Sequence, residues 1–118
     1  MTPFGARLRA LREQRGITLT ELAAALHVSP AYLSALEHGK RGRPSAGLIH
    51  QVNEFFGLIW DEAEELVQLA RLSHPRVVVD TSGLSPRATE LANLLARRIR
   101  DLPEERVEAI LRLIEPTD

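Results

Sequence analysis

Three cations, Lys40, Arg41 and Arg43, occur within four residues of the chain, with the glycines Gly39 and Gly42 between and before them. Lysine binds phosphate as a point charge, and arginine binds it through a planar fork of N–H donors. A loop of this composition is typical either of an ordinary solvated surface or of a surface that contacts a nucleic-acid backbone. The elements that position the loop decide between the two interpretations.

The residue types that usually perform catalysis or bind metal form no recognisable pattern. The chain has no cysteine, which excludes a disulfide and a thiolate metal site. No glycine-rich phosphate loop of a nucleotide-binding protein is present, and the histidines show no metal-ligand spacing. We therefore expect no enzymatic activity, no metal site and no cofactor. The histidines are His27, His38, His50 and His74.

The residues before the basic loop have the pattern of two short helices joined by a tight turn. Thr18 would cap the first helix, and Glu21 completes a capping box. Ser29 would cap the second, with Pro30 at the first position, where no backbone N–H is needed, and Gly39 at its end. Such a pair is a helix-turn-helix, whose second helix enters the DNA major groove. The apolar residues at helical spacing are Leu22, Ala23, Leu26, Leu33 and Leu36.

Further residues around this motif have the spacing of one known family. They are Arg7, Leu8, Leu11, Val28, the run from Leu33 to Arg41, Pro44, Ser45, Leu48 and Val52. On these residues the segment from roughly 4 to 70 resembles the lambda-repressor-like, or XRE, family of bacterial and phage DNA-binding proteins. The resemblance implies an all-α chain that begins with a five-helix DNA-binding domain.

Two positions depart from the family pattern. Leu19 stands where the family often has a glutamine that touches a phosphate, so we expect that contact to be missing. His27 stands in the turn, where the family usually has glycine. Because histidine tolerates a left-handed backbone better than most residues, we expect His27 to adopt one.

The resemblance implies which side chains face DNA. The positions that face base edges fall on Pro30, Ala31, Tyr32 and Ala35, with Ser34 nearby, and none of these is the Arg, Lys, Asn or Gln that reads bases through paired hydrogen bonds. Ala31 and Ala35 could pack on thymine methyl groups, Tyr32 could bond a phosphate or a base edge, and small residues could simply allow close approach. We expect close approach, methyl contacts and readout of groove shape together. The candidate DNA-binding residues are Ser29, Pro30, Ala31, Tyr32, Ser34, Ala35, His38, Lys40, Arg41 and Arg43.

The resemblance also implies an ion pair between Arg12, in a helix from about Pro3 to Gln14, and Glu37, at the end of the second motif helix. We interpret this pair as structural and expect its disruption to unfold the domain. Arg9, on the same helix, is expected to be solvated.

Charge is divided unevenly along the chain. Residues 1–50 hold seven Lys and Arg against three Asp and Glu, a net +4, whereas residues 51–118 hold eight against thirteen, a net −5. The basic half contains the helix-turn-helix, as phosphate binding requires. We expect the acidic half to face away from DNA.

Two more helices complete the expected DNA-binding domain. Ser45 would cap one that ends at Gly57, and the next begins near Trp60 with acidic residues that complement the helix dipole. We divide the chain into a DNA-binding domain (1–72), a linker with a short strand (73–84) and a helical dimerisation region (85–118). The expected core residues of the two helices are Leu48, Ile49, Val52, Phe55, Phe56, Trp60, Ala63, Leu66, Val67 and Ala70.

The end of the chain carries an apolar stripe at helical spacing. A helix capped by Ser85 is interrupted at Pro103, and the stripe continues on a last helix. The β-branched run before it, 77–79, either pairs with its copy in another subunit or is extended linker. The candidate dimerisation residues are Val77, Val79, Leu84, Leu91, Leu95, Ile99, Leu102, Ile110 and Ile114.

Such amphipathic helices need an apolar partner, which is either the first domain or the tail of a second subunit. Helix-turn-helix proteins commonly bind two half-sites about 34 Å apart, so we expect a homodimer on double-stranded DNA. The resemblance thus implies a sequence-specific transcriptional regulator, most simply a repressor. The alternative is an antitoxin or another interaction module whose tail binds a protein partner. No apolar run reaches the length of a membrane span, and the start lacks a signal core, so we expect a cytoplasmic protein.

Overall fold

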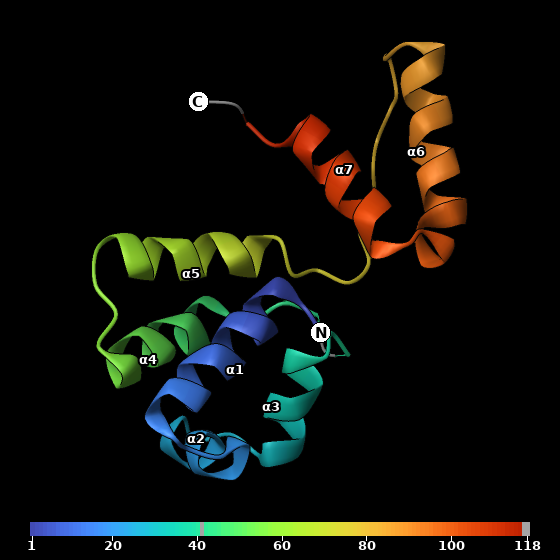
Figure 1. The fold of residues 1–118 in the computed structure, drawn as a ribbon. Helices are drawn as coiled ribbons and strands as arrows, with labels where there is room; N and C mark the ends of the chain where they lie inside the picture. Colours follow the sequence, from blue (N-terminus) through green and yellow to red (C-terminus); the bar gives the residue numbers. More distant parts are fainter. Residues whose placement is uncertain (41, 117–118) are drawn as a thin grey trace. The chain divides into compact units, whose positions relative to one another are not determined.

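The computed structural model describes residues 1–40 and 42–116; the candidate DNA-binding residue Arg41 and residues 117–118 lie outside them. Within the described residues every regular element is helical, which confirms the all-α fold (Figure 1). No described helix is both long and apolar enough to cross a membrane. The helices are α1 (Pro3–Arg15), α2 (Leu19–Ala25), α3 (Pro30–Glu37), α4 (Ala46–Phe56), α5 (Asp61–Arg71), α6 (Pro86–Arg98), the 3-10 turn η1 (Ile99–Asp101) and α7 (Glu104–Ile114).

The chain forms two compact units, Met1–Val77 and Val78–Asp118. In the first, α2 packs on α3, and α1 packs on both α3 and α5, with α4 against α5. Figure 1 shows α5 above α1 in the view, with α2 and α3 below it. Every one of α1–α5 contributes to the single core of this unit. Its fully buried side chains include Phe4, Leu8, Leu22, Leu26, Leu33, Leu36, Val52 and Leu66.

The helix starts of the motif follow the predicted capping residues. Thr18 Oγ1 accepts from Glu21 N at 3.1 Å, and the Glu21 carboxylate accepts from Thr18 N at 3.2 Å, which completes the capping box. His27 adopts the expected left-handed backbone, with φ +58. Its conformation lets Val28 N donate to Ala23 O at 3.0 Å, so the turn between α2 and α3 closes without a glycine.

The prediction of a core position is wrong for two residues of the first unit, Trp60 and Phe55. Trp60 is 84% exposed, because Leu58, two residues earlier, fills the core at this connection and α5 begins only at Asp61. Phe55 is 36% exposed and lies at the edge of the buried stripe of α4. The Phe56 ring, next to it, is the one that packs inwards.

Ser73, the first residue of the expected linker, belongs to the packed first unit. It is 3% exposed, and its hydroxyl accepts from Phe4 N at 2.8 Å while it donates to Leu69 O. This hydrogen-bond chain ties the end of α5 to the start of α1. The packed unit therefore extends past residue 72.

The second unit consists of α6, η1 and α7 after an extended segment. The strand considered for 77–79 does not form in the described chain, which offers no second strand to pair with it. A turn stabilised by Ser82 precedes α6; hydrogen bonds from the side chain and backbone of Ser82 hold the pKa of Asp80 below its ordinary value. The apolar stripe expected at the end of the chain runs along α6 and continues through η1. No side chain of α6, η1 or α7 is buried.

Candidate nucleic-acid interface

The start of α3 presents short side chains to solvent. Ser29 Oγ accepts from Tyr32 N at 3.0 Å, and Pro30 takes the first helical position. Ser29, Pro30 and Ala31 are exposed, whereas Tyr32, Ser34 and Ala35 are half-buried. The exposed start of α3 is therefore small and uncharged, which permits a close approach to a flat or grooved partner.

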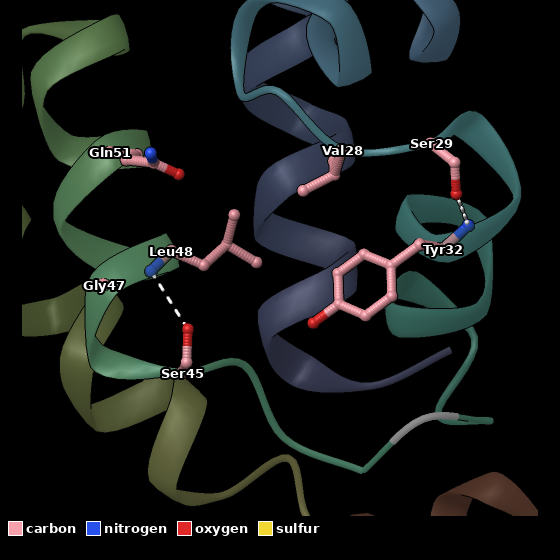
Figure 2. Close-up of a pocket in the computed structure, with 7 residues that line it drawn as sticks. All are labelled: Val28, Ser29, Tyr32, Ser45, Gly47, Leu48 and Gln51. Atoms are coloured by element: carbon pink, nitrogen blue, oxygen red, sulfur yellow. Dashed lines mark hydrogen bonds between the residues drawn. The ribbon is translucent and has the colours of Figure 1, made fainter.

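Tyr32 also packs against the core of the first unit. Its ring points from α3 towards Leu48, with Val28 beside it, and packs against the core (Figure 2). Together these residues border an open hollow of about 480 Å³ between the starts of α3 and α4. The lining is completed by Ser29, Ser45, Gly47 and Gln51.

Gln51 is a candidate contact that the sequence interpretation missed. It is exposed on α4 and lines the same hollow as Tyr32. Glutamine bonds both adenine edges and phosphates, and α3 itself supplies no such amide. The glutamine was visible in the sequence, but only the packing shows that its side of α4 adjoins α3.

Three contacts from the start of the chain fix the end of α3. Thr2 N donates to Glu37 O at 3.0 Å, and Gly5 lies directly against the Glu37 backbone. Arg12 donates through Nε and Nη2 to the two carboxylate oxygens of Glu37, each at 3.3 Å. The Arg12 and Glu37 side chains are only 13% and 3% exposed. α1 thus holds α3 in place; Thr2 and Gly5 were not identified from the sequence.

The closure of α3 sets the path of the basic loop. Gly39 has φ +77, and Lys40 N donates to Ala35 O at 2.8 Å while Gly39 N donates to Leu36 O at 3.4 Å. These two bonds form a Schellman motif, which needs a left-handed residue at the glycine. The backbone of Lys40 is therefore tied to α3.

The described cations of the loop are exposed. Lys40 and Arg43 lie in solvent, and Pro44, which follows them, is buried and anchors the far end of the loop. His38 is exposed, and its Nδ1 lies 2.9 Å from Ser34 O. The interface thus joins an uncharged helix start to a cationic loop.

Acidic residues of the first unit concentrate on another element. The first turn of α5 carries Asp61, Glu62 and Glu64, and α5 packs on α1 and α4. Among the described residues no three His, Asp or Glu side chains gather in a way that could hold a metal. An uncharged helix start beside a cationic loop can bind a polyanion whose groove admits a helix, with charge neutralised at its border.

The comparisons with known proteins agree with this geometry. The helix-turn-helix domain family matches residues 3–73, and the chain belongs to that family. It is 46% identical over 54 residues to the HTH-type transcriptional repressor RghR of Bacillus subtilis, covering 46% of this chain and 40% of RghR. It is 40% identical over 57 residues to the HTH-type transcriptional regulator RamB of Mycobacterium tuberculosis, covering 48% of this chain and 12% of RamB. The aligned segments span less than half of these relatives, and no solved structure matches the chain.

Proposed function

We propose that this protein is a sequence-specific transcriptional repressor that binds a two-half-site operator as a homodimer. α3 enters the major groove, and the loop from Gly39 to Pro44 lies on the sugar-phosphate backbone. The observation that carries the proposal is the exposed, uncharged start of α3 beside the solvent-exposed Lys40 and Arg43. The names of the relatives support the regulatory role. We assign no residue a catalytic role. We place the repressor in the cytoplasm, together with the DNA that it binds.

Sequence specificity comes mainly from how closely α3 fits the groove, and not from charged side chains that hydrogen-bond base edges. Ala31 and Ala35, four residues apart, lie on one face of α3 and offer methyl groups to thymines. The amide of Gln51 and the hydroxyl of Tyr32 add hydrogen bonds from the border of the hollow. Sequence is then selected largely through the shape and deformability of the DNA.

The test begins with a duplex selected by the full chain from a random library. Fluorescence anisotropy at several salt concentrations compares this duplex with a scrambled one. For Lys40→Ala/Arg43→Ala we expect a shallower salt dependence, by about 0.9 for each lost phosphate contact, or about 3.6 for two residues in each of two subunits. Tight binding only to the selected duplex is expected for the wild type.

The matched control removes two cations outside the interface. Arg9 pairs with Glu13 at 3.2 Å on the exposed face of α1, and Arg71 lies in the last turn of α5. Arg9→Ala/Arg71→Ala should leave the salt slope unchanged. Equal affinity for selected and scrambled duplexes would contradict sequence-specific binding, and an unchanged slope in the Lys40/Arg43 variant would remove the loop from the phosphates.

The second unit, called the tail, supports the homodimer because α6, η1 and α7 would not be stable without a partner surface. Leu91 and Ile99 are 64% and 52% exposed, and the described tail buries no side chain of its own. Isolated helices of this length are marginal in water, and a unit this small rarely folds without a partner. Basic residues end α6 and acidic residues begin α7, so two tails in a two-fold arrangement can bring opposite charges together. These residues are Arg97, Arg98, Glu104 and Glu105.

A charge placed on the apolar stripe of α6 should dissociate the dimer. Leu91→Glu removes the same apolar contact twice in a two-fold interface, so we expect dimerisation to weaken by at least about a hundredfold. Asn93→Glu introduces the same charge on the opposite side of α6 and should leave the dimer intact. Sedimentation equilibrium measures both. A wild-type chain that remains monomeric at concentrations that saturate DNA would contradict the homodimer and favour the antitoxin-like alternative.

A further inference from the structure

The three consecutive valines Val77, Val78 and Val79, called the valine run, connect the two units of the chain and are exposed. Their exposed fractions are 71%, 95% and 63%, although the connections between units are usually polar. β-branched residues favour paired strands, and a row of them in water is a surface on which another chain can pair. A dimer contact through α6 alone leaves the valine run uncovered.

The backbone of the valine run also lacks a partner within the chain. Among the described residues, no hydrogen bond involves a backbone N–H or C=O group of the run. Local hydrogen bonds mark its two ends. Arg76 N donates to His74 Nδ1 at 3.3 Å before the run, and Ser82 N donates to Asp80 Oδ1 at 2.9 Å after it. The extended segment between these two bonds can therefore pair with another strand along its whole length.

The residues that border the valine run carry opposite charges. Arg76 precedes the run and Asp80 follows it, and both side chains are exposed. Neither forms an ion pair among the described residues. In an antiparallel pair of two copies centred on Val78, Arg76 of each copy would lie opposite Asp80 of the other, and valine would lie opposite valine. A parallel pair would place like charges opposite each other, which is destabilising.

The same charges select one register. Successive side chains of a strand point to opposite faces, so a two-fold antiparallel pair must place one residue opposite its own copy. Moving the centre from Val78 to either neighbouring valine would place Arg76 or Asp80 opposite a valine. With Val78 at the centre, the N–H and C=O groups of Val77 and Val79 can all bond to the partner strand.

We propose that residues 76–80 form a two-stranded antiparallel ribbon with the same residues of a second copy of this chain. The proposal rests on the proposed function, because a two-stranded ribbon is marginal alone and needs the tails of a homodimer to hold it. One face of the ribbon carries Val77 and Val79 of both copies and is wholly apolar, so it is suited to pack on the apolar stripe of the tails. The other face carries Val78 and the charged pairs and lies in solvent.

The ribbon has a consequence for operator recognition. Ser73 is still buried in the first unit, so only residues 74 and 75 would separate each DNA-binding unit from the ribbon. A linker this short spans few distances. We therefore expect tight binding over a narrow range of half-site spacings, whereas a flexible connection would tolerate many.

Cysteine cross-linking tests the ribbon directly, because the chain has no cysteine of its own. In Val78→Cys the two Cα atoms would lie about 4.5 Å apart, within the range that a disulfide spans. With diamide as oxidant and without DNA, we expect most of the full chain to become a covalent dimer that dithiothreitol reverses. Val77→Cys and Val79→Cys are the matched controls, because each residue lies opposite the other and not opposite its own copy. Each control alone should cross-link at least about tenfold more slowly, and a mixture of the two should cross-link.

Sedimentation equilibrium of the wild-type chain separates this proposal from the proposed function. A dimeric wild type, with Val78→Cys cross-linking no faster than the two controls, would overturn the ribbon and leave the homodimeric repressor standing. A wild type that remains monomeric at concentrations that saturate DNA would overturn both.

An exchange of charges tests the register without a covalent bond. Arg76→Asp places two carboxylates opposite each other twice in the dimer, and Asp80→Arg does the same with two cations, so each should weaken dimerisation about tenfold. The double variant Arg76→Asp/Asp80→Arg restores opposite charges and should dimerise like the wild type, although it also lacks the hydrogen bond from Ser82 N. A double variant as weak as the single ones would contradict the register.

Discussion

Replacing Gly5 by alanine should unfold the first unit or destabilise it severely. A Cβ at this position would overlap the carbonyl oxygen of Glu37 and lie 2.6 Å from its Cα and 2.8 Å from its carbonyl carbon. All three atoms belong to the backbone of α3, so no side chain can move aside. α1 would have to shift away from α3, and with it the hydrogen bond from Thr2 N to Glu37 O.

We expect Gly5→Ala to cost about 3 kcal/mol or more, at the upper end of overpacking effects and a large part of the stability of a small domain. Urea unfolding followed by circular dichroism measures it. Gly47→Ala is the matched control, because the new Cβ would have only Ser45 Oγ nearby, at 4.0 Å. Alanine there should raise stability by about 0.5–1 kcal/mol through helix propensity. Equal stability of Gly5→Ala and the wild type would contradict the close approach of α1 and α3.

Arg12→Ala should destabilise the unit by about 3–5 kcal/mol, because it leaves a buried carboxylate without its partner. The Glu37 side chain is 3% exposed and receives both of its charged hydrogen bonds from Arg12. The loss should appear as a lower urea midpoint with an unchanged slope, and DNA binding should fall only because the folded fraction falls.

Two further variants identify the cause of that loss. Arg12→Met/Glu37→Leu replaces the pair by apolar side chains and should recover most of the stability, since the cost comes from an isolated charge rather than from a missing attraction. Arg9→Ala breaks the exposed pair with Glu13 and should cost less than about 0.5 kcal/mol. A double variant no more stable than Arg12→Ala would show that the pair itself, rather than the unpaired charge, holds α3.

Local signals allowed most of the first unit to be predicted. The capping residues Thr18, Ser29 and Ser45 accept from backbone N–H groups within their own helix, so the sequence around each is enough to place the start. The left-handed turn at His27 is likewise a property of a few consecutive residues. These features do not depend on which distant segment packs nearby.

The wrong or missing predictions concern residues whose burial or role depends on packing against segments far away in the sequence. Leu58 and Trp60 lie two residues apart at a helix connection, and only the three-dimensional arrangement of α4 and α5 determines which of them is buried. Gly5 looks like a weak point in a helix until α3 is placed against it. Gln51 becomes a candidate contact only when its side of α4 is known to line the same hollow as the start of α3. The sequence thus identified α3 and its basic loop, but not the neighbours that hold and extend them.

In the proposed dimer, the absence of a core within α6 and α7 makes the lifetime of the protein depend on its abundance. Below the dissociation constant of the dimer the tail loses its covering surface, and helices of 13 and 11 residues are then marginal in water. Proteases cut such opened segments, so unpaired chains are degraded first. Under the proposed function, paired chains persist, and the protein is either abundant enough to be stable or is cleared.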